Sequence, residues 1–341
     1  MSSGRTFYRV PVAEVISETE QACSLVLAVP PDLAGSFAYR PGQFVTVRIP
    51  TADGGSVARC YSMSSSPDAG DQPTITVKRM PGGHASNWIA DNVTAGSALD
   101  LLPPAGTFTP RSLEADFLLF AGGSGITPVM SILKSALAVG RGRIVLIYAN
   151  SDERSVIFGP ELRRLQATAP HRLIVLHWLD VLQGAPDATA LRELARPYAS
   201  CDAYICGPDP YLAVVRQALA DLGAPAQRVH AERFLSLADN PFETTEATGG
   251  VAAVLEVSLD DQVHQLRWPA GARMLDVLID ADLDPPYSCR EGICGACACR
   301  LVAGQVEMAH NEVLADSDLA DGYILACQSV AVSAEISVSY S

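Results

Sequence analysis

The sequence predicts a multidomain fold: an antiparallel β-barrel, then an α/β domain with a parallel sheet, then a small cysteine-rich domain. Short alternating runs broken by glycine and proline turns fill residues 1–112, whereas apolar strand-like and helix-like segments take turns over residues 113–234. A polar stretch and a cluster of cysteines follow. At about 150 residues per domain, 341 residues allow two or three domains, and we expect three.

Alternation and turn signals carry the barrel prediction. Residues 44–49 and 74–78 are strand-like, and turn signals occur at Pro41-Gly42, Asp53-Gly54-Gly55 and Pro81-Gly82-Gly83. Short strands at this spacing are typical of an antiparallel barrel.

The second domain is predicted from buried strands that alternate with helices, a pattern typical of a parallel sheet covered on both faces. The predicted strands are residues 117–121, 144–149, 173–178 and 203–206, and the predicted helices are residues 128–138, 160–167 and 210–222.

Residues 235–250 contain almost nothing apolar and are predicted to be a linker. The third domain, residues 251–341, contains two hairpin-like runs at 253–259 and 263–268. A helical segment at 274–281 and a closing strand near Ile336 are also expected.

Four cysteines have the spacing of a metal centre. Cys289-x4-Cys294-x2-Cys297, with Cys327 after 29 intervening residues, is the plant-type spacing for a [2Fe–2S] cluster. Iron prefers thiolates, and Gly292 and Gly295 let the loop bend sharply and aim N–H groups at sulfur. A structural zinc site is the alternative, although zinc ligands usually come as two short knuckles.

The other five cysteines form no evident disulfide framework, and Cys299 is expected to be a packed thiol rather than a fifth ligand. The N-terminus has no apolar core of a secretory signal, so a reducing cytoplasm is expected. The longest uncharged stretch, residues 117–133, is too short and too rich in glycine to span a bilayer. No membrane association is therefore predicted.

A glycine-rich turn marks a nucleotide site. The strand 117–121 runs into Gly122-Gly123-Ser124-Gly125-Ile126-Thr127-Pro128 and then a helix. Glycines let the backbone approach a pyrophosphate, and a helix N-terminus supplies N–H groups and a positive dipole. The turn lacks the GxGxxG pattern of dehydrogenases.

The order of the domains resembles that of the ferredoxin–NAD(P)H reductase superfamily, in its oxygenase-reductase branch. A barrel comes first, then the domain with the GGSGITP sequence, then the cysteine-rich domain. The resemblance covers nearly the whole chain. It implies a flavin-binding β-barrel, a nucleotide-binding α/β domain and a C-terminal β-grasp domain of the plant-type ferredoxin kind. FAD is the flavin that it implies, although some related enzymes with this domain order use FMN.

The resemblance also implies roles for single residues. Arg59-Cys60-Tyr61-Ser62 matches the family's Arg-x-Tyr-Ser motif, which we expect in a turn between barrel strands. Arg59 would pair with the flavin phosphate, Tyr61 would pack on the flavin, and Ser62 would hydrogen-bond near N5 as a catalytic group. Gly83-His84-Ala85-Ser86 matches the family's Gly-x-x-Ser motif. The flavin site expected from this region also includes Val77, Lys78, Gly82, Gly83 and Ser86.

On the nicotinamide side, Cys206-Gly207-Pro208 resembles a family motif in which Cys206 would sit beside the reacting ring as a catalytic residue. A buried structural thiol is the alternative. Phe234 resembles the aromatic residue that covers the flavin in some members, with core packing as the alternative. Asn150 ends the strand that precedes Ser151-Asp152-Glu153, whose acids would repel a 2′-phosphate, so NADH is expected over NADPH despite Arg154.

Net charge limits the classes of partner. Residues 251–341 hold 14 acidic and 4 basic residues, a balance of −10 out of −14 for the chain. This argues against nucleic acid and leaves open either a plain solvated surface or a docking face for a basic protein.

The chain resembles the reductase components of 3-ketosteroid 9α-hydroxylases in three segments: around Ser288-Cys289-Arg290-Glu291-Gly292, at Phe234-Leu235-Ser236-Leu237 and at Asn240-Pro241-Phe242. A terminal oxygenase, of the Rieske type, is the partner that this resemblance implies. Reductases of phenylacetyl-CoA epoxidases or aromatic-ring oxygenases and a redox sensor are the alternatives.

Overall fold

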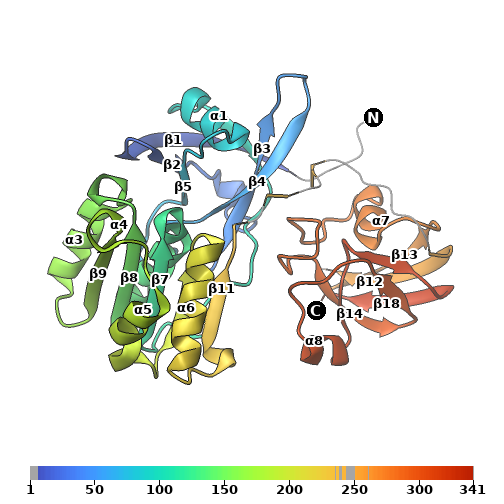
Figure 1. The fold of residues 1–341 in the computed structure, drawn as a ribbon. Coiled ribbons are helices and arrows are strands. Elements are labelled where there is room, and N and C mark those ends of the chain that lie inside the picture. The colour runs from blue at the N-terminus through green and yellow to red at the C-terminus, as the bar shows by residue number, and fades with distance from the viewer. Residues whose placement is uncertain (1–6, 235, 238–239, 243–249, 260, 341) are drawn as a thin grey trace.

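The computed structural model describes residues 7–234, 236–237, 240–242, 250–259 and 261–340. Three bodies are visible, each built round its own sheet: the barrel at the top, the parallel-sheet domain at the lower left and the C-terminal domain at the right (Figure 1). Residues 235, 238–239 and 243–249 of the predicted linker lie outside the described residues.

The first sheet is antiparallel, with the strand order β4-β3-β6-β1-β2-β5. A bridge between Met63 and Ile75 joins its two ends, so the sheet closes into the predicted barrel. Val45 and Val47 face the barrel core, so Thr46 between them faces outward. The elements are β1 (Tyr8–Thr19), β2 (Ala22–Leu27), β3 (Phe44–Pro50), β4 (Ser56–Ser62), β5 (Thr74–Lys78), β6 (Ala98–Leu101) and the helix α1 (His84–Asn92).

The second sheet is parallel, in the order β11-β10-β7-β8-β9, as predicted. Alternate residues of β7 pack on opposite helical layers: Leu119 meets α2 and α3, whereas Leu118 meets α5 and α6. The strands are β7 (Phe117–Gly122), β8 (Ile144–Asn150), β9 (Leu173–Leu179), β10 (Asp202–Cys206) and β11 (Val229–Glu232). The helices are α2 (Ile126–Val139), α3 (Gly159–Thr168), α4 (Asp180–Gln183), α5 (Ala188–Ala195) and α6 (Asp209–Asp221).

The third sheet has the order β13-β12-β18-β14-β16, with β12 and β18 parallel and the other pairs antiparallel. Leu275 and Leu278 of α7 pack with Leu255 and Trp268 of the sheet, which gives the expected β-grasp arrangement. The strands of this sheet are β12 (Ala253–Leu259), β13 (Gln262–Trp268), β14 (Ala298–Ala303), β16 (Tyr323–Leu325) and β18 (Glu335–Ser339). A separate two-stranded sheet pairs β15 (Val306–Met308) with β17 (Ser329–Ala331). The helices are α7 (Met274–Asp280) and α8 (Asp316–Ala320).

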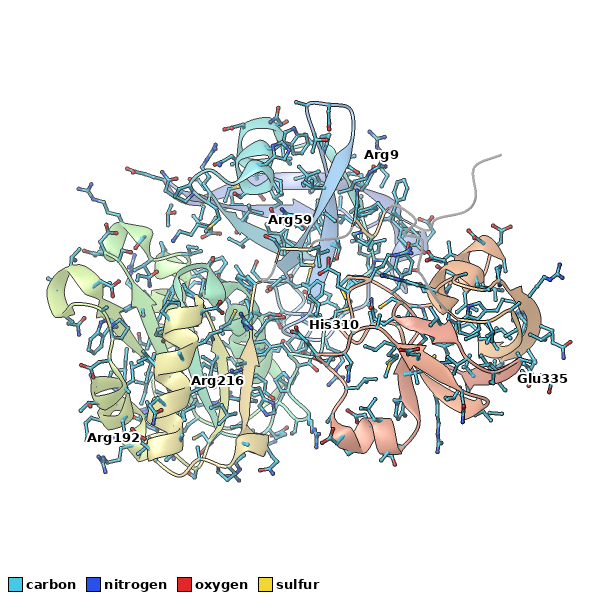
Figure 2. The ribbon with its side chains drawn as sticks, turned by 45° about the vertical axis from the view of Figure 1, so that its right-hand side comes forward. Arg9, Arg59, Arg192, Arg216, His310 and Glu335 are labelled. Atoms are coloured by element: carbon cyan, nitrogen blue, oxygen red, sulfur yellow. The ribbon has the colours of Figure 1, made fainter. Side chains whose placement is uncertain are left out.

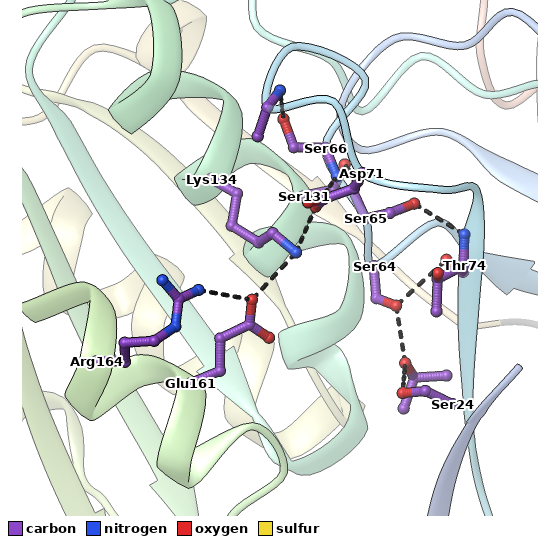
Figure 3. A network of polar contacts seen from close by, with 12 residues as sticks. Ser24, Ser64, Ser65, Ser66, Asp71, Thr74, Ser131, Lys134, Glu161 and Arg164 are labelled. Atoms are coloured by element: carbon purple, nitrogen blue, oxygen red, sulfur yellow. Dashed lines mark hydrogen bonds and ion pairs between the residues drawn. The ribbon is translucent and has the colours of Figure 1, made fainter. Parts of the chain in front are cut away.

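The barrel contacts both neighbours, in different ways. Phe44, Ala58, Leu102 and Ala105 join the apolar cluster of the C-terminal domain. A polar network faces the parallel-sheet domain (Figure 3): Ser131 Oγ donates to the Ser65 carbonyl at 2.6 Å, and Lys134 lies 2.5 Å from Asp71 and 3.2 Å from Glu161. Among the helices of the described residues, none combines the length and apolar character that crossing a bilayer requires.

Candidate functional site

Two adjoining cavities lie where the domains meet. The barrel cavity, about 460 Å³, lies between the barrel and the loops of the parallel-sheet domain. The cluster cavity, about 440 Å³, lies between all three domains. Cys60, Ser62 and Phe234 line both. Arg59 on the barrel, Arg216 on α6 and His310 on the C-terminal domain mark the three domains round this region (Figure 2).

The barrel cavity gathers many of the predicted cofactor residues. It is lined by Arg59, Tyr61, Ser62, Lys78, Gly83, Ser86, Thr127, Gly207 and Phe234, among others. These residues come from β4, the end of β5, the starts of α1 and α2, the loop after β10, and the segment that follows β11. Segments far apart in the sequence thus converge on one hollow.

The Arg-x-Tyr-Ser segment lies on a strand, not in the turn that we expected. The turn is residues 51–55, closed by Thr51 N–H donating to the Gly55 carbonyl at 3.0 Å. The motif follows in β4, where Tyr61 pairs with Val45 and Ser62 with Phe44. Strand pairing therefore fixes the backbone of the motif, and all four of its residues line the barrel cavity.

Two cationic side chains and a helix N-terminus make the barrel cavity suitable for phosphate. Arg59 and Lys78 both line it, and Arg59 Nη1 donates to the Ala58 carbonyl at 2.6 Å. Gly83 caps α1, and a Cβ there would lie 3.0 Å from the Met80 Cβ. The free N–H groups at a helix start favour an anion.

Close contact between two loops accounts for glycines after β7, in addition to the predicted approach of a pyrophosphate. A Cβ at Gly125 would lie 2.1 Å from the Cys206 carbonyl, and one at Gly207 would lie 3.1 Å from the Gly122 nitrogen. These glycines let the loops after β7 and β10 touch each other. Gly123 has φ +53°, and Lys78 Nζ lies 3.5 Å from where its Cβ would be.

Several predicted residues line neither cavity: Val77, Gly82, Gly122, Gly123, Gly125, Asn150 and Cys206. Val77 points into the barrel core. Cys206 ends β10, is fully enclosed, and has its pKa raised well above the usual value by burial. Asn150 ends β8 and is 5% exposed, and neither its amide nitrogen nor its amide oxygen has a partner among the described residues. A buried amide without a partner is the kind of group that a ligand completes.

The four predicted cluster cysteines lie together in two pairs, all at most 4% exposed. The neighbouring thiol of Cys294 lowers the pKa of Cys289, and the neighbouring thiol of Cys297 lowers the pKa of Cys327. Within the described residues, no group of three or more His, Cys, Asp or Glu side chains is spaced to hold a metal ion. Two pairs are what two tetrahedral irons bridged by sulfide need.

Backbone and amide N–H groups point at the sulfurs. Glu291 N–H donates to Cys289 Sγ at 3.3 Å, Cys327 N–H to Cys297 Sγ at 3.5 Å, and Gln328 Nε2 to Cys327 Sγ at 3.6 Å. Gly292 has φ +77°, and a Cβ there would lie 2.6 Å from the His310 carbonyl. The donors, the paired thiols and the glycine fit a [2Fe–2S] cluster. Cys299 is a separate buried thiol packed in the apolar cluster of the C-terminal domain, as predicted.

Glu232 is a site residue that the sequence did not reveal. It ends β11, in register with Cys206, and lines the cluster cavity. Its Oε2 is enclosed without a hydrogen-bond partner among the described residues, and burial raises the pKa of the carboxyl to about 8. In the sequence, only its acidic side chain could have suggested a role, because that side chain becomes buried only where the three domains meet.

A direct hydrogen bond joins the barrel to the cluster loop. Thr46 Oγ1 lies 2.8 Å from Ser288 Oγ and 3.4 Å from Cys60 Sγ. Ser288 precedes the first cluster cysteine, and Cys60 lies inside the Arg-x-Tyr-Ser segment. The two predicted centres are therefore connected through a few side chains.

Three family models match the chain in the order of its domains. An oxidoreductase FAD-binding domain matches residues 9–109, an oxidoreductase NAD-binding domain matches 119–217, and a 2Fe-2S iron-sulfur cluster binding domain matches 257–332. The chain is 50% identical to the ferredoxin reductase component of 3-ketosteroid-9-alpha-monooxygenase from Rhodococcus rhodochrous, over 96% of this chain and 95% of that one. The chain belongs to this reductase family.

Two more similarities extend over the whole length. The ferredoxin reductase component of the same kind of monooxygenase from Mycobacterium tuberculosis is 52% identical, over 96% of this chain and 94% of that one. The solved structure of phthalate dioxygenase reductase covers 98% of both chains at 26% identity and a TM-score of 0.58. This member of the reductase family is thus an oxidoreductase with FAD-binding, NAD-binding and [2Fe–2S] domains, and its homologues are reductase components of oxygenases.

Proposed function

We propose that this reductase takes a hydride from NADH onto FAD and passes the electrons singly through its [2Fe–2S] cluster to a Rieske-type terminal oxygenase of a 3-ketosteroid 9α-hydroxylase. The observation that carries the proposal is the sharing of Cys60, Ser62 and Phe234 by the barrel cavity and the cluster cavity. A flavin in the first would lie directly beside the cysteines that line the second.

The side chains of the barrel cavity supply binding and orientation. We assign Arg59 and Lys78 to the phosphates, Tyr61 and Phe234 to the flavin rings, and Ser62 to the flavin edge. Phe234 is 48% exposed, so it is free to be covered by a ring system. When bound, FAD supplies the exchange between a two-electron hydride and single electrons.

The choice of NADH rests on the end of β8. Asp152 is held there because its carboxylate accepts from Ser155 N–H at 2.9 Å, and Glu153 follows it. Two carboxylates at this edge favour ribose hydroxyls and repel a 2′-phosphate. The unpaired amide of Asn150 beside them is available to the nucleotide.

The partner is inferred from charge and from relatives. The C-terminal domain carries most of the chain's net charge, −10 of −14. This negative charge would steer a partner with a basic face toward the domain. With the four cluster ligands set aside, the other five cysteines form no disulfide and are left as free thiols, as a reducing cytoplasm would keep them.

The test uses the purified, cluster-loaded protein under anaerobic conditions. NADH should reduce it with at least tenfold higher kcat/KM than NADPH, and released flavin should run as FAD on a column. Adding a candidate Rieske oxygenase and a 3-ketosteroid should consume the steroid only when NADH is present. Turnover with an aromatic-ring oxygenase instead would redirect the partner, and absence of sustained NADH oxidation would refute the electron-transfer role.

A further inference from the structure

Two hydrogen bonds between buried hydroxyl groups join the barrel to the two neighbouring domains. Ser66 Oγ and Ser135 Oγ lie 2.7 Å apart where the barrel meets α2 of the parallel-sheet domain. Thr46 Oγ1 and Ser288 Oγ lie 2.8 Å apart where the barrel meets the cluster loop. All four residues are at most 1% exposed, so each pair keeps its geometry without competition from water.

The position of Thr46 follows from the strand that carries it. Its neighbours Val45 and Val47 fill the barrel core, so Thr46 points outward toward the C-terminal domain. It pairs in register with Cys60 of β4, and its hydroxyl also contacts Cys60 Sγ at 3.4 Å. Thr46 is therefore fixed to the strand that supplies Arg59, Tyr61 and Ser62.

Ser288 is fixed to the other centre. It is joined by one peptide bond to Cys289, whose side chain lines the cluster cavity. Nearby, Gly295 approaches Thr107 of the barrel so closely that a Cβ would lie 3.2 Å from Thr107 Cγ2. The cluster loop thus has an apolar contact and one buried hydrogen bond against the barrel.

We propose that the Thr46–Ser288 hydrogen bond is the positioning contact that sets the transfer of electrons from the flavin to the cluster, without affecting hydride transfer. The inference rests on the proposed electron route. In each transfer one electron would leave the reduced flavin and convert one ferric ion of the cluster to ferrous, and the cluster would give that electron to the terminal oxygenase before it takes the next one. Thr46 and Ser288 keep their protons throughout, and the flavin proton passes to water once both electrons have left.

Thr46→Val and Ser288→Ala test the contact, with Thr46→Ser as the variant that keeps the hydroxyl. Stopped-flow spectra with NADH resolve flavin reduction from cluster reduction. We expect Thr46→Val and Ser288→Ala to slow cluster reduction by clearly more than twofold, because the rate of electron transfer falls as the flavin and the cluster move apart. Flavin reduction should stay within twofold, and Thr46→Ser should behave like the wild type.

Two further measurements separate positioning from general damage. Hydrogen exchange of the oxidised protein, without NADH, should rise in β3 and residues 286–291 of Thr46→Val. Iron and sulfide contents should stay unchanged, as should the EPR signal of the chemically reduced cluster. Ser135→Ala is the matched control, because it breaks the equivalent hydroxyl pair at the other interface. It should leave cluster reduction as in the wild type.

Equal slowing of both steps in Thr46→Val, wild-type cluster reduction in both Thr46→Val and Ser288→Ala, or the same loss in Ser135→Ala would overturn the inference. A wild-type protein that shows no flavin-to-cluster transfer at all would instead overturn the proposed function, so the two failures are distinguishable.

Discussion

Replacing Glu232 by Gln should change how the stability of this reductase depends on pH. The residue as a whole is half-buried, but its Oε2 is enclosed without a partner among the described residues. Burial raises the pKa of the carboxyl from 4.5 to about 8. The folded protein therefore keeps a proton on Glu232 over a range in which the unfolded chain has released it.

The sign and size follow from linkage. Because the folded pKa is raised, the favourable contribution is complete below pH 4.5 and is lost as pH rises toward about 8. Each pKa unit is worth about 1.4 kcal/mol, so the loss would approach about 5 kcal/mol in a fully dry site. Water in the cluster cavity screens the carboxylate, and we expect about 2 kcal/mol. Gln does not titrate and escapes this loss.

Scanning calorimetry of the intact protein near pH 5 and near pH 8 measures the effect. Relative to the wild type, E232Q should gain about 4 °C or more in Tm between the two pH values, since about 1 kcal/mol shifts the Tm of a domain of up to about 250 residues by at least about 2 °C. A buried amide costs the same at both pH values, so the difference isolates the titration. Parallel pH profiles for the two proteins would refute the burial argument.

Three further outcomes are expected. Asp276→Asn should destabilise the C-terminal domain by about 3–5 kcal/mol in denaturant unfolding, because it leaves the buried guanidinium of Arg290 without its ion pair; an effect below about 1 kcal/mol would contradict this. Cys327→Ser should lose iron and labile sulfide by chemical analysis, whereas Cys299→Ser should keep both, and equal losses would undo the ligand assignment. Raising ionic strength from about 0.01 M to about 0.1 M shortens the Debye length from about 30 Å to about 10 Å and should slow reduction of the oxygenase; a rate indifferent to salt would exclude electrostatic docking.

Local patterns made much of the fold predictable. The apolar runs of β7, β8 and β10 appear in the structure within one residue of their predicted bounds, because buried parallel strands are continuous in sequence. Three of the four cluster cysteines lie on one loop, so their spacing alone indicates the centre. The Arg-x-Tyr-Ser segment was misplaced because strand pairing of β3 with β4, a non-local interaction, extends the strand through it.

What the sequence could not show depends on contacts between domains. Thr46 and Ser288 are 242 residues apart, and each is an ordinary hydroxyl until the barrel and the cluster loop meet. Glu232 is likewise unremarkable in sequence, because its enclosure needs the barrel, β11 and the cluster loop together. Gly125 was assigned to pyrophosphate, whereas its tightest constraint is the Cys206 carbonyl.

The apolar side chains that attach the C-terminal domain to the barrel limit how electrons can leave the molecule. Moving that domain away would expose Phe44, Ala58, Leu102 and Ala105 to water, at about 25 cal/mol for each Å² uncovered. If the C-terminal domain moved between the flavin and the acceptor, this unfavourable free energy would recur in every catalytic cycle. We therefore expect the electron acceptor to bind while the cluster stays beside the barrel. It would approach the cluster from the part of the cluster loop that remains exposed.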